Sequence, residues 1–565
     1  MDDNRFFERN LLALSRRDPE LCSRLKAARI GTGGYVFTKT PTGETVPALA
    51  DDSGIARALH STVNPKREAE RLTAANDGET GFTVFLGLGG GFAPAAALER
   101  PGAAGALAID YDVAGVAALF RERDYSALLG DPRFTLLVNP PPSLVESAIA
   151  ELYRPALLGG VRVLPLRARV ERDKKNFGEA GEAAKRGIEK VSADYSAQAH
   201  FGTRWFANII RNVMAIRAPD PDAVARTRIP PRREAAICAA GPSLDAQIPL
   251  LLERKKREGD GGPFVICADT ALPALLAQGL KPDAVVSIDC QHIGYHHFMN
   301  SACRRIPLFL DVASPPALST LSDFPFFFAG GHPLAALLRQ KWAPLPALDT
   351  SGGNVAFACL SLAESLGARR VSVYGADFSY PAGKIYAKGA YVFPFFETRQ
   401  TRLSTLETGV SSLLFRAPFL PPESADGASR RETATMRAYR ASFGQKISAM
   451  EAEVSMAPGL GLPPLVHGKK TSRARREDER GFTPARPTTG AADFLETYRR
   501  DVEALPPLPP LGGDALDAEA RRIFATLLPL MAALKRRRPQ SPSPELFEEA
   551  KRHCVDQIDR VLGSR

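Results

Sequence analysis

Short apolar runs alternate with longer amphipathic segments through the middle of the chain. The segment 271–280 between two such runs has the periodicity of a helix. Apolar runs that have the composition of buried strands occur at 235–238, 263–269, 284–291 and 371–377. Strands that alternate with helices predict parallel βαβ units. We therefore expect an α/β fold with a parallel sheet, whose loops meet at the carboxyl edge of the strands.

The pattern divides the 565 residues into four expected parts. The proline-free segment 177–216 is amphipathic, which favours a long connecting helix or a helix pair. Proline- and glycine-rich breaks separate the last amphipathic segments of the chain. We expect a Rossmann-like N-terminal domain at 1–170, connecting helices at 171–230, the central catalytic domain at 231–415 and a helical C-terminal region with flexible linkers at 416–565.

Two turns built from small residues come directly before expected helices in the central part. One is Gly241-Pro242-Ser243, and the other is TSGGN at 350–354. The first N–H groups of a helix have no partner inside the helix, so they attract anions, phosphate above all. We expect both turns to hold the phosphate part of a ligand.

Side chains capable of acid–base chemistry follow the same strands. Asp269, Asp289 and Asp377 come at the ends of three strands. Tyr380 and Tyr386 follow in the next loop, six residues apart. A phosphate-binding turn that faces two phenols indicates group transfer from a phosphorylated donor.

Three of these motifs resemble the bacterial CMP-sialic-acid-dependent sialyltransferases of glycosyltransferase family 42. The motifs are Gly-Pro-Ser-Leu at 241–244, Thr-Ser-Gly at 350–352 and Gly-x-Asp-Phe at 375–378. In that family the loop glycines and serine hold the CMP part of the donor, and two tyrosines six residues apart stabilise the departing phosphate. Tyr380 and Tyr386 match this spacing, although Ser379 is inserted before the first of them.

A wider set of segments resembles the motility accessory factor (Maf) proteins. These are flagellin glycosyltransferases with a domain named after the archaeal pterin enzyme MptE. The segments are LHSTVNPKREAERL (59–72), FGTRWFANIIRN (201–212) and ADTALPALLAQGLKPDAVVSID (268–289). The resemblance implies an accessory Rossmann-like domain followed by a sialyltransferase-like central domain.

The resemblance implies a metal-independent glycosyltransferase without a resident cofactor. Its reaction would move a nonulosonic acid of the pseudaminic or legionaminic type from a CMP-sugar to Ser or Thr of flagellin. The catalytic side chains would be Asp377, Tyr380 and Tyr386. The donor-binding residues would be Gly241, Pro242, Ser243, Asp269, Asp289, Thr350, Ser351, Gly352, Gly353 and Asn354.

The general base is not assigned by this resemblance. The sialyltransferases use a histidine soon after the second tyrosine, and this chain has none at that place. His296, His297 and His332 are the candidates closest in sequence, and we expect each of them to be a structural histidine. In the segment 201–212 the polar side chains of Arg204, Asn208, Arg211 and Asn212 recur on roughly one face. Lining of the cleft is one hypothesis for them, but we expect them to be exposed.

Two other functions remain open. An MptE-type enzyme would transfer diphosphate from ATP to a 6-hydroxymethylpterin and would need clustered carboxylates for Mg²⁺. The strand at 284–291 offers a single carboxylate, Asp289, which argues against this alternative. A non-catalytic accessory protein that binds flagellin is the second alternative.

The N-terminal part carries its own candidate ligand site. An apolar strand at 81–86 runs into Gly87, Gly89 and Gly91, and the next strand ends at Asp110. This spacing resembles a nucleotide or S-adenosylmethionine pocket, in which the acid binds ribose hydroxyls. In the Maf resemblance these glycines only shape a turn, so a ligand at Gly87, Gly89, Gly91 and Asp110 is one of two hypotheses.

Composition narrows the choice of partners and compartment. The net charge of +10 is spread along the chain without a recognised nucleic-acid module, so we expect an anionic sugar donor and no nucleic acid. No apolar run has the length of a membrane span. The seven scattered cysteines lie mostly in apolar segments, and the start of the chain lacks signal-peptide features, so we expect a cytoplasmic protein with reduced thiols.

Overall fold

The structure, a computed structural model, forms two compact units that are described separately here. One unit comprises residues 1–202 and 505–552, and the other comprises residues 203–504 and 553–565. The described residues are 5–28, 34–50, 55–74, 80–100, 105–216, 232, 234–299, 301, 303–421, 430–466, 482, 485–508 and 516–563.

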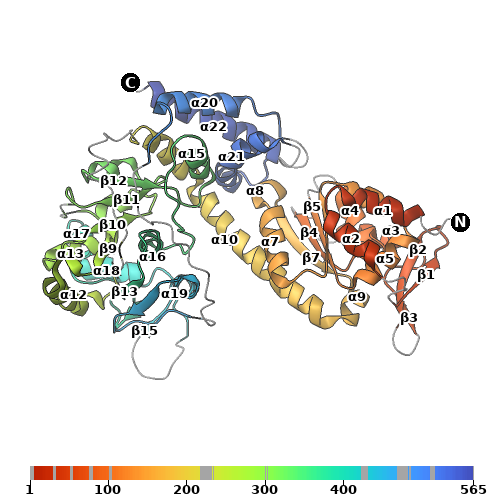
Figure 1. Ribbon diagram of the computed structural model, residues 1–565, viewed down its shortest axis with the longest axis horizontal. Coiled ribbons are helices and arrows are strands. Elements are labelled where there is room, and N and C mark those ends of the chain that lie inside the picture. Colours follow the sequence, from red (N-terminus) through yellow and green to blue (C-terminus); the bar gives the residue numbers. More distant parts are fainter. Residues whose placement is uncertain are drawn as a thin grey trace. The chain divides into compact units, whose positions relative to one another are not determined.

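The N-terminal unit is built on a four-stranded parallel sheet with the strand order β6-β5-β4-β7 (Figure 1). Its strands are β4 (Thr80–Leu86), β5 (Gly105–Asp110), β6 (Phe134–Val138) and β7 (Gly160–Pro165). A separate antiparallel sheet contains β1 (Tyr35–Lys39), β2 (Thr45–Ala50) and β3 (Ala56–Ala58). The helices of this unit are α1 (Arg5–Ser15), α2 (Pro19–Ala27), α3 (Pro65–Ala74), α4 (Phe92–Glu99), α5 (Val113–Glu122), α6 (Ser126–Gly130), α7 (Pro142–Leu152), α8 (Pro155–Leu158), α9 (Arg167–Arg172) and α21 (Ala518–Arg537).

The central unit is built on a seven-stranded parallel sheet with the order β12-β11-β10-β9-β8-β13-β16. Its strands are β8 (Glu234–Cys238), β9 (Phe264–Ala268), β10 (Ala284–Ser287), β11 (Leu308–Asp311), β12 (Pro325–Phe328), β13 (Arg370–Tyr374) and β16 (Glu453–Met456). The strand order reverses between β8 and β13. Open α/β sheets bind ligands at the carboxyl ends of the strands beside such a reversal.

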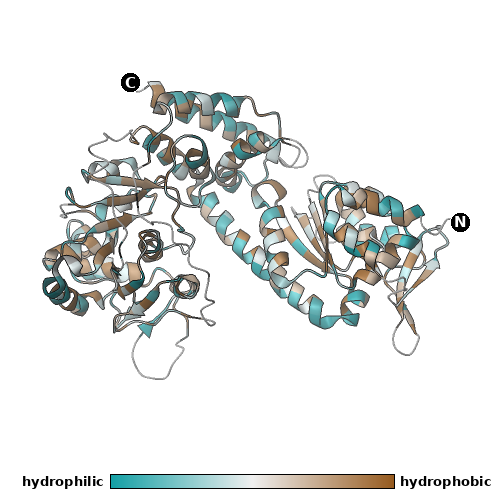
Figure 2. Cartoon of the chain, viewed as in Figure 1, coloured by the Kyte–Doolittle hydropathy of each residue, from teal (hydrophilic) through white to brown (hydrophobic). Residues whose placement is uncertain are grey.

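The helices of the central unit connect these strands. They are α12 (Leu244–Glu258), α13 (Leu272–Ala277), α14 (Ile293–His296), α15 (Pro333–Lys341), α16 (Val355–Ser365), α17 (Val392–Glu397), α18 (Leu406–Leu414), α19 (Ala434–Ala449) and α20 (Ala491–Glu503). The short strands β14 (Tyr380–Pro381) and β15 (Arg430–Arg431) pair with each other. Helix α16 is apolar nearly all round and packs on β8, β9 and β10, whereas α12 shows a polar outer side (Figure 2).

The expected strands and the connecting helix are confirmed. The four apolar runs contain β8, β9, β10 and β13, and α10 (Lys174–Val213) covers most of the expected connecting segment 171–230, of which 217–230 lie outside the described residues. Helix α22 (Ser543–Gly563) ends the described chain. The seven cysteines are all buried and free.

The C-terminal region is mainly helical, as expected, but it does not form a separate part. Within the region expected to be helical, Glu453–Met456 is strand β16, which pairs with β13 and completes the central sheet. Helix α21 instead contacts α8 in the N-terminal unit. The two units therefore divide the chain inside α10 and α22 and not at the expected boundaries.

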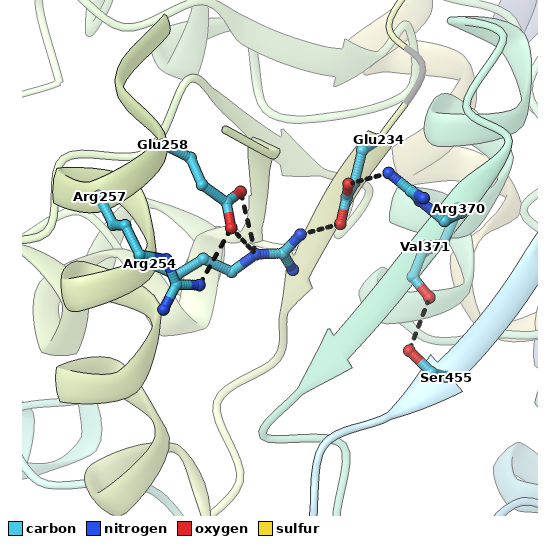
Figure 3. Close-up of polar contacts among 7 residues, drawn as sticks. All are labelled: Glu234, Arg254, Arg257, Glu258, Arg370, Val371 and Ser455. Atoms are coloured by element: carbon cyan, nitrogen blue, oxygen red, sulfur yellow. Dashed lines mark hydrogen bonds and ion pairs between the residues drawn. The ribbon is translucent and has the colours of Figure 1, made fainter. Parts of the chain in front are cut away.

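Ion pairs at the amino end of the central sheet hold neighbouring elements together. Figure 3 shows Glu234, at the start of β8, between the guanidinium groups of Arg254 on α12 and Arg370 on β13. Beside them, the Ser455 hydroxyl of β16 donates to the Val371 carbonyl of β13 at 3.5 Å. These contacts fix β8, β13 and β16 at the edge opposite the candidate site.

Candidate functional site

The Gly-Pro-Ser turn after β8 is joined to the loop after β13. The Ser243 N–H donates to Asp377 Oδ2 at 2.8 Å, and the Ser243 hydroxyl donates to Asp377 Oδ1 at 2.5 Å. The Gly241 N–H donates to the Gly375 carbonyl at 2.8 Å. Pro242 lies between these two anchored residues. The predicted donor-binding turn and the predicted catalytic Asp377 are thus in direct contact.

A segment from the C-terminal region covers this contact. The Leu460 N–H donates to the Ser243 hydroxyl at 2.7 Å. A Cβ on Gly461 would lie only 2.3 Å from the Cα of Asp377, so the covering backbone packs tightly against that residue. Ser243 and Asp377 are only 4% and 6% exposed. Their polar groups are directed at one another, which indicates a structural role at the reversal point of the sheet.

The tyrosine-bearing loop is anchored on the same turn. The Ala387 N–H donates to the Ala240 carbonyl at 2.9 Å. The Lys388 N–H donates to Oδ1 of Asp245, in the first turn of α12, at 2.8 Å. Tyr386 is adjacent to this anchor, so the structure brings the phenol-bearing loop and the Gly-Pro-Ser turn together as the sequence predicts.

The small-residue loop at 350–354 has partly satisfied donors. Both the N–H and the hydroxyl of Ser351 donate to Asp349 Oδ1, at 3.0 and 2.7 Å. The Asn354 side chain caps α16 by accepting from the Phe357 N–H at 3.0 Å. The Gly353 N–H donates to the Thr350 carbonyl. The N–H groups of Thr350, Gly352 and Asn354 have no hydrogen-bond partner among the described residues, and they are therefore the backbone donors of this loop that an anion would meet.

Gly353 connects this loop to an aromatic side chain that the sequence analysis did not identify. Its backbone has φ +70°, a conformation that favours glycine, and an added Cβ would lie 3.2 Å from the Tyr439 ring of α19. Burial raises the pKa of Tyr439, against the opposing charge of Arg416. The loop therefore lies beside a neutral phenol.

Tyr386 pairs with Tyr391 and not directly with Tyr380. The ring centroids of Tyr386 and Tyr391 are 5.7 Å apart, and the two rings pack edge-on. Burial, reinforced by Tyr391, raises the pKa of Tyr386. Burial likewise raises the pKa of Tyr380, whose ring packs edge-on against Phe419 with centroids 6.3 Å apart. Tyr380, Tyr386 and Tyr439, whose pKa values are all raised, therefore stay protonated and able to donate hydrogen bonds at neutral pH.

The positive charge of Arg416 acts on three of these phenols. The Arg416 charge, just after α18, acts to lower the pKa values of Tyr380, Tyr391 and Tyr439 against the effect of burial. Its guanidinium group is exposed and has no ion pair or hydrogen bond to another described residue. We use the name phenol cluster for Tyr380, Tyr386, Tyr391 and Tyr439 together.

Asp269, at the end of β9, is fully buried and has several partners. Its Oδ1 accepts from the Thr270 N–H at 2.7 Å, and its Oδ2 accepts from the Ser287 hydroxyl at 2.6 Å. His297 Nδ1 lies 3.0 Å from the same Oδ2. The His297 ring contacts Tyr391, with centroids 4.3 Å apart. Asp269 is therefore connected to the phenol cluster through a histidine.

Asp289, at the end of the run that contains β10, acts electrostatically on two of the phenols. Its Oδ1 accepts from the Gln291 N–H at 2.8 Å, and burial raises its pKa. Its charge also raises the pKa values of Tyr391 and Tyr439, which places it near both. Another buried carboxyl, Asp311 at the end of β11, was missed by the sequence analysis, and burial raises its pKa to about 6.

The histidines named from the sequence have different surroundings. His332 caps α15 by accepting from the Leu334 N–H at 3.1 Å, and burial lowers its pKa to about 3, so it is a neutral structural residue as expected. His296 Nδ1 lies 3.0 Å from the Met299 sulfur. His297 alone among these three lies against both a carboxylate and a phenol.

The end of α10 supports the loops at the carboxyl edge, contrary to expectation. Asn208 and Asn212 were expected to be exposed, but they are 5% and 1% exposed. The Asn208 amide donates to the carbonyls of Cys290 and Ala313, at 3.0 and 2.8 Å. The Asn212 amide donates to the carbonyls of Val312 and Ser314, at 2.8 Å each. These side chains satisfy loop carbonyls that would otherwise be buried without donors.

In the N-terminal unit, the glycine-rich turn is filled by the chain's own side chains. Cβ atoms on Gly87, Gly89 and Gly91 would lie within about 3 Å of side chains from His60, Tyr125, Leu166 and Arg169. Asp110 accepts from the Leu88 and Tyr111 N–H groups and pairs with buried Arg169 at 2.9 Å. Gly87, Gly89, Gly91 and Asp110 all lie against other residues of the protein. These contacts favour the hypothesis that the glycines only shape a turn over the hypothesis of a bound ligand.

The described residues contain neither a metal-binding cluster nor a helix that could cross a membrane. Nowhere in the described part do three or more His, Cys, Asp or Glu side chains gather in an arrangement that would hold a metal ion. None of the described helices combines the length and the apolar character needed to cross a membrane.

Comparison with known proteins identifies relatives of parts of the chain. Residues 207–383 match the family of 6-hydroxymethylpterin diphosphokinase MptE-like proteins. An uncharacterized protein of Treponema pallidum (strain Nichols) is 45% identical over 92 residues, which are 16% of this chain and 32% of that protein. Another from the same organism is 32% identical over 150 residues, which are 26% of this chain and 66% of that protein. The chain thus matches less than two thirds of the length of either relative.

A solved structure is similar over the whole chain. The Maf glycosyltransferase from Magnetospirillum magneticum AMB-1 superposes with a TM-score of 0.56 at 14% identity, over 100% of this chain and 92% of that chain. At this identity the similarity establishes a shared fold. The chain therefore has the fold of a Maf glycosyltransferase, and its residues 207–383 form an MptE-like domain.

Proposed function

We propose that this chain is a glycosyltransferase that moves a nonulosonic acid, of the pseudaminic or legionaminic type, from a CMP-sugar to serine or threonine of flagellin. The fold shared with a Maf glycosyltransferase supports the reaction class. A cytoplasmic location belongs to the same proposal, since buried free thiols suit a reducing compartment.

The observation that carries the proposal is the position of Tyr439, one member of the phenol cluster, beside the small-residue loop. Tyr439 contacts Gly353, and the loop of Tyr386 is tied to the Gly-Pro-Ser turn. When the bond between the sugar and the phosphate breaks, its electron pair leaves on a phosphate oxygen. Protonated phenols and a nearby guanidinium group would stabilise that charge, since donors aimed at developing charge need no reorganisation during the reaction.

The parts of the proposed donor site have separate tasks. The loop from Thr350 to Asn354 would bind the phosphate through the N–H groups of Thr350, Gly352 and Asn354, which have no partner among the described residues. Gly241, Pro242 and Ser243 would shape the floor, and Asp377 would hold that floor in place. Asp289 would bind hydroxyl or amino groups of the donor, because a carboxylate accepts hydrogen bonds from them. Asp269 would act indirectly, through His297.

Calorimetric titration of the full chain tests the donor site. CMP should bind without a divalent cation, and the Ser351→Trp variant should lose this binding because an indole would fill the loop. Ser351 is exposed, so the bulky side chain need not disturb the core. Ser23→Trp, also at an exposed serine but in α2 of the N-terminal unit, should bind CMP as the wild type does. Equal CMP binding by both variants would contradict the proposed location.

The same titration decides between the proposal and its alternatives. The MptE-like match at 207–383 supports 6-hydroxymethylpterin diphosphokinase as the second candidate. That enzyme should bind ATP only with Mg²⁺ and should not prefer CMP. Binding of S-adenosylmethionine would redirect attention to the glycine-rich turn of the N-terminal unit. A non-catalytic flagellin-binding protein would bind flagellin but transfer no sugar to it.

A further inference from the structure

His297 is buried against Tyr391 of the phenol cluster, so a substrate has little access to it. It is 5% exposed, and Asp269 beside it is completely buried. Its Nδ1 lies 3.0 Å from Asp269 Oδ2, in the position of an ion pair. Its ring rests on Tyr391, with centroids 4.3 Å apart, and the Tyr391 ring in turn packs edge-on against Tyr386 at 5.7 Å. Asp269, His297, Tyr391 and Tyr386 thus form a connected series that ends at a proposed catalytic phenol.

We propose that His297, in its charged form, is a positioning residue that acts through Tyr391 to set the Tyr386 hydroxyl as the donor to the leaving phosphate. The inference rests on the proposed function and assigns a histidine that the sequence analysis expected to be merely structural. A charged imidazolium under Tyr391 would also add a positive potential where phosphate charge develops. His297 need not touch the substrate for either effect.

The groups around His297 determine which form it takes. Asp269 faces it from the turn after β9, Asp289 from the loop after β10, and Tyr391 from the loop before α17. Burial acts to lower the pKa of His297, but the two carboxylates outweigh burial and raise that pKa above the ordinary 6.5. Farther along the series, Tyr386 and Arg416 act on Tyr391.

The sign of the pH dependence follows from this arrangement. A raised pKa keeps His297 charged up to a higher pH than a free histidine, and the charge is lost as pH rises through the raised value. If the charged form is the active one, kcat should fall as pH rises through this raised pKa. A general base would behave oppositely, because its neutral form is active and kcat would rise through the same range.

The test is the pH profile of kcat for transfer from a CMP-sugar to flagellin, measured with the wild type and with His297→Gln. We expect an alkaline decrease in the wild type. In His297→Gln we expect kcat below that pH to be about tenfold lower, without the decrease and with CMP affinity kept. A rising limb that disappears in the variant would overturn the proposal in favour of a general base. An unchanged alkaline limb in the variant would overturn it in favour of a structural histidine.

A matched histidine provides the control. His332→Asn keeps an N-cap on α15, since asparagine is a good capping residue, and should keep the wild-type pH profile. If the wild type transfers sugar but His297→Gln fails to unfold cooperatively, Asp269→Asn offers a second variant, in which the alkaline limb should shift to lower pH. If the wild type neither binds CMP nor transfers the sugar, the proposed function fails first and this inference fails with it.

Discussion

Replacement of Tyr386 by phenylalanine is expected to lower kcat about a hundredfold, while CMP affinity changes by less than about twofold. The ring of Tyr386 packs on Tyr391, and phenylalanine keeps that contact. The substitution removes only the hydroxyl that would donate to the leaving phosphate. Because this donation strengthens as charge develops, its loss should appear in kcat and not in ground-state binding.

Single-turnover transfer and calorimetric CMP binding measure these two quantities separately. Tyr295→Phe provides the control, since it makes the same chemical change at an exposed tyrosine that is 48% exposed. It should leave both quantities unchanged. An unaltered kcat in Tyr386→Phe would remove Tyr386 from the mechanism and would also remove the basis for the role of His297.

Replacement of Asp377 by alanine is expected to destabilise the central unit by about 3 kcal/mol and to abolish CMP binding. The carboxylate accepts from both the N–H and the hydroxyl of Ser243, and all three groups are buried. Without an acceptor, those two donors would remain buried and unsatisfied. The turn between β8 and α12 would then lose its link to the loop after β13.

Tryptophan fluorescence during urea unfolding would report this change selectively. The chain has two tryptophans, and both Trp205 and Trp342 belong to the central unit. Asp377→Asn distinguishes a structural role from a chemical one, since it keeps the shape and one acceptor oxygen. Intermediate stability with proportionately weaker CMP binding would support the structural role. Full stability and full CMP binding with no transfer would instead show that Asp377 is catalytic, as the family resemblance implied.

Four of the seven strands of the central sheet could be predicted, because β8, β9 and β10 are almost entirely buried and β13 is largely apolar. Such strands appear in the sequence as continuous apolar runs, and those containing β8, β9, β10 and β13 were recognised. Strands β11, β12 and β16 were not predicted. Strand β16 is short, only partly buried and preceded closely by helix α19. Its strand conformation depends on pairing with β13, a contact that local sequence does not encode.

Only part of the candidate site could be predicted, because some of its residues reach the site only through tertiary packing. Motifs that directly follow strands were located correctly, since parallel strands bring their loops to one edge. Tyr391, Tyr439 and Arg416 lie outside those motifs and approach the edge only through tertiary packing. The glycines before Asp110 are the opposite case. Their spacing is typical of a ligand site, but the side chains of His60 and Arg169 occupy the space beside them. Spacing alone could not reveal those side chains.

The most direct test of the central claim is the mass of purified flagellin after incubation with this protein and a CMP-activated nonulosonic acid. The proposal predicts an increase by one or more nonulosonic acid residues on serine or threonine, with one CMP released for each residue transferred. The increase should be absent with Ser351→Trp and present with Ser23→Trp. Unchanged flagellin, when the wild-type protein binds both CMP and flagellin, would contradict the proposed glycosyltransferase.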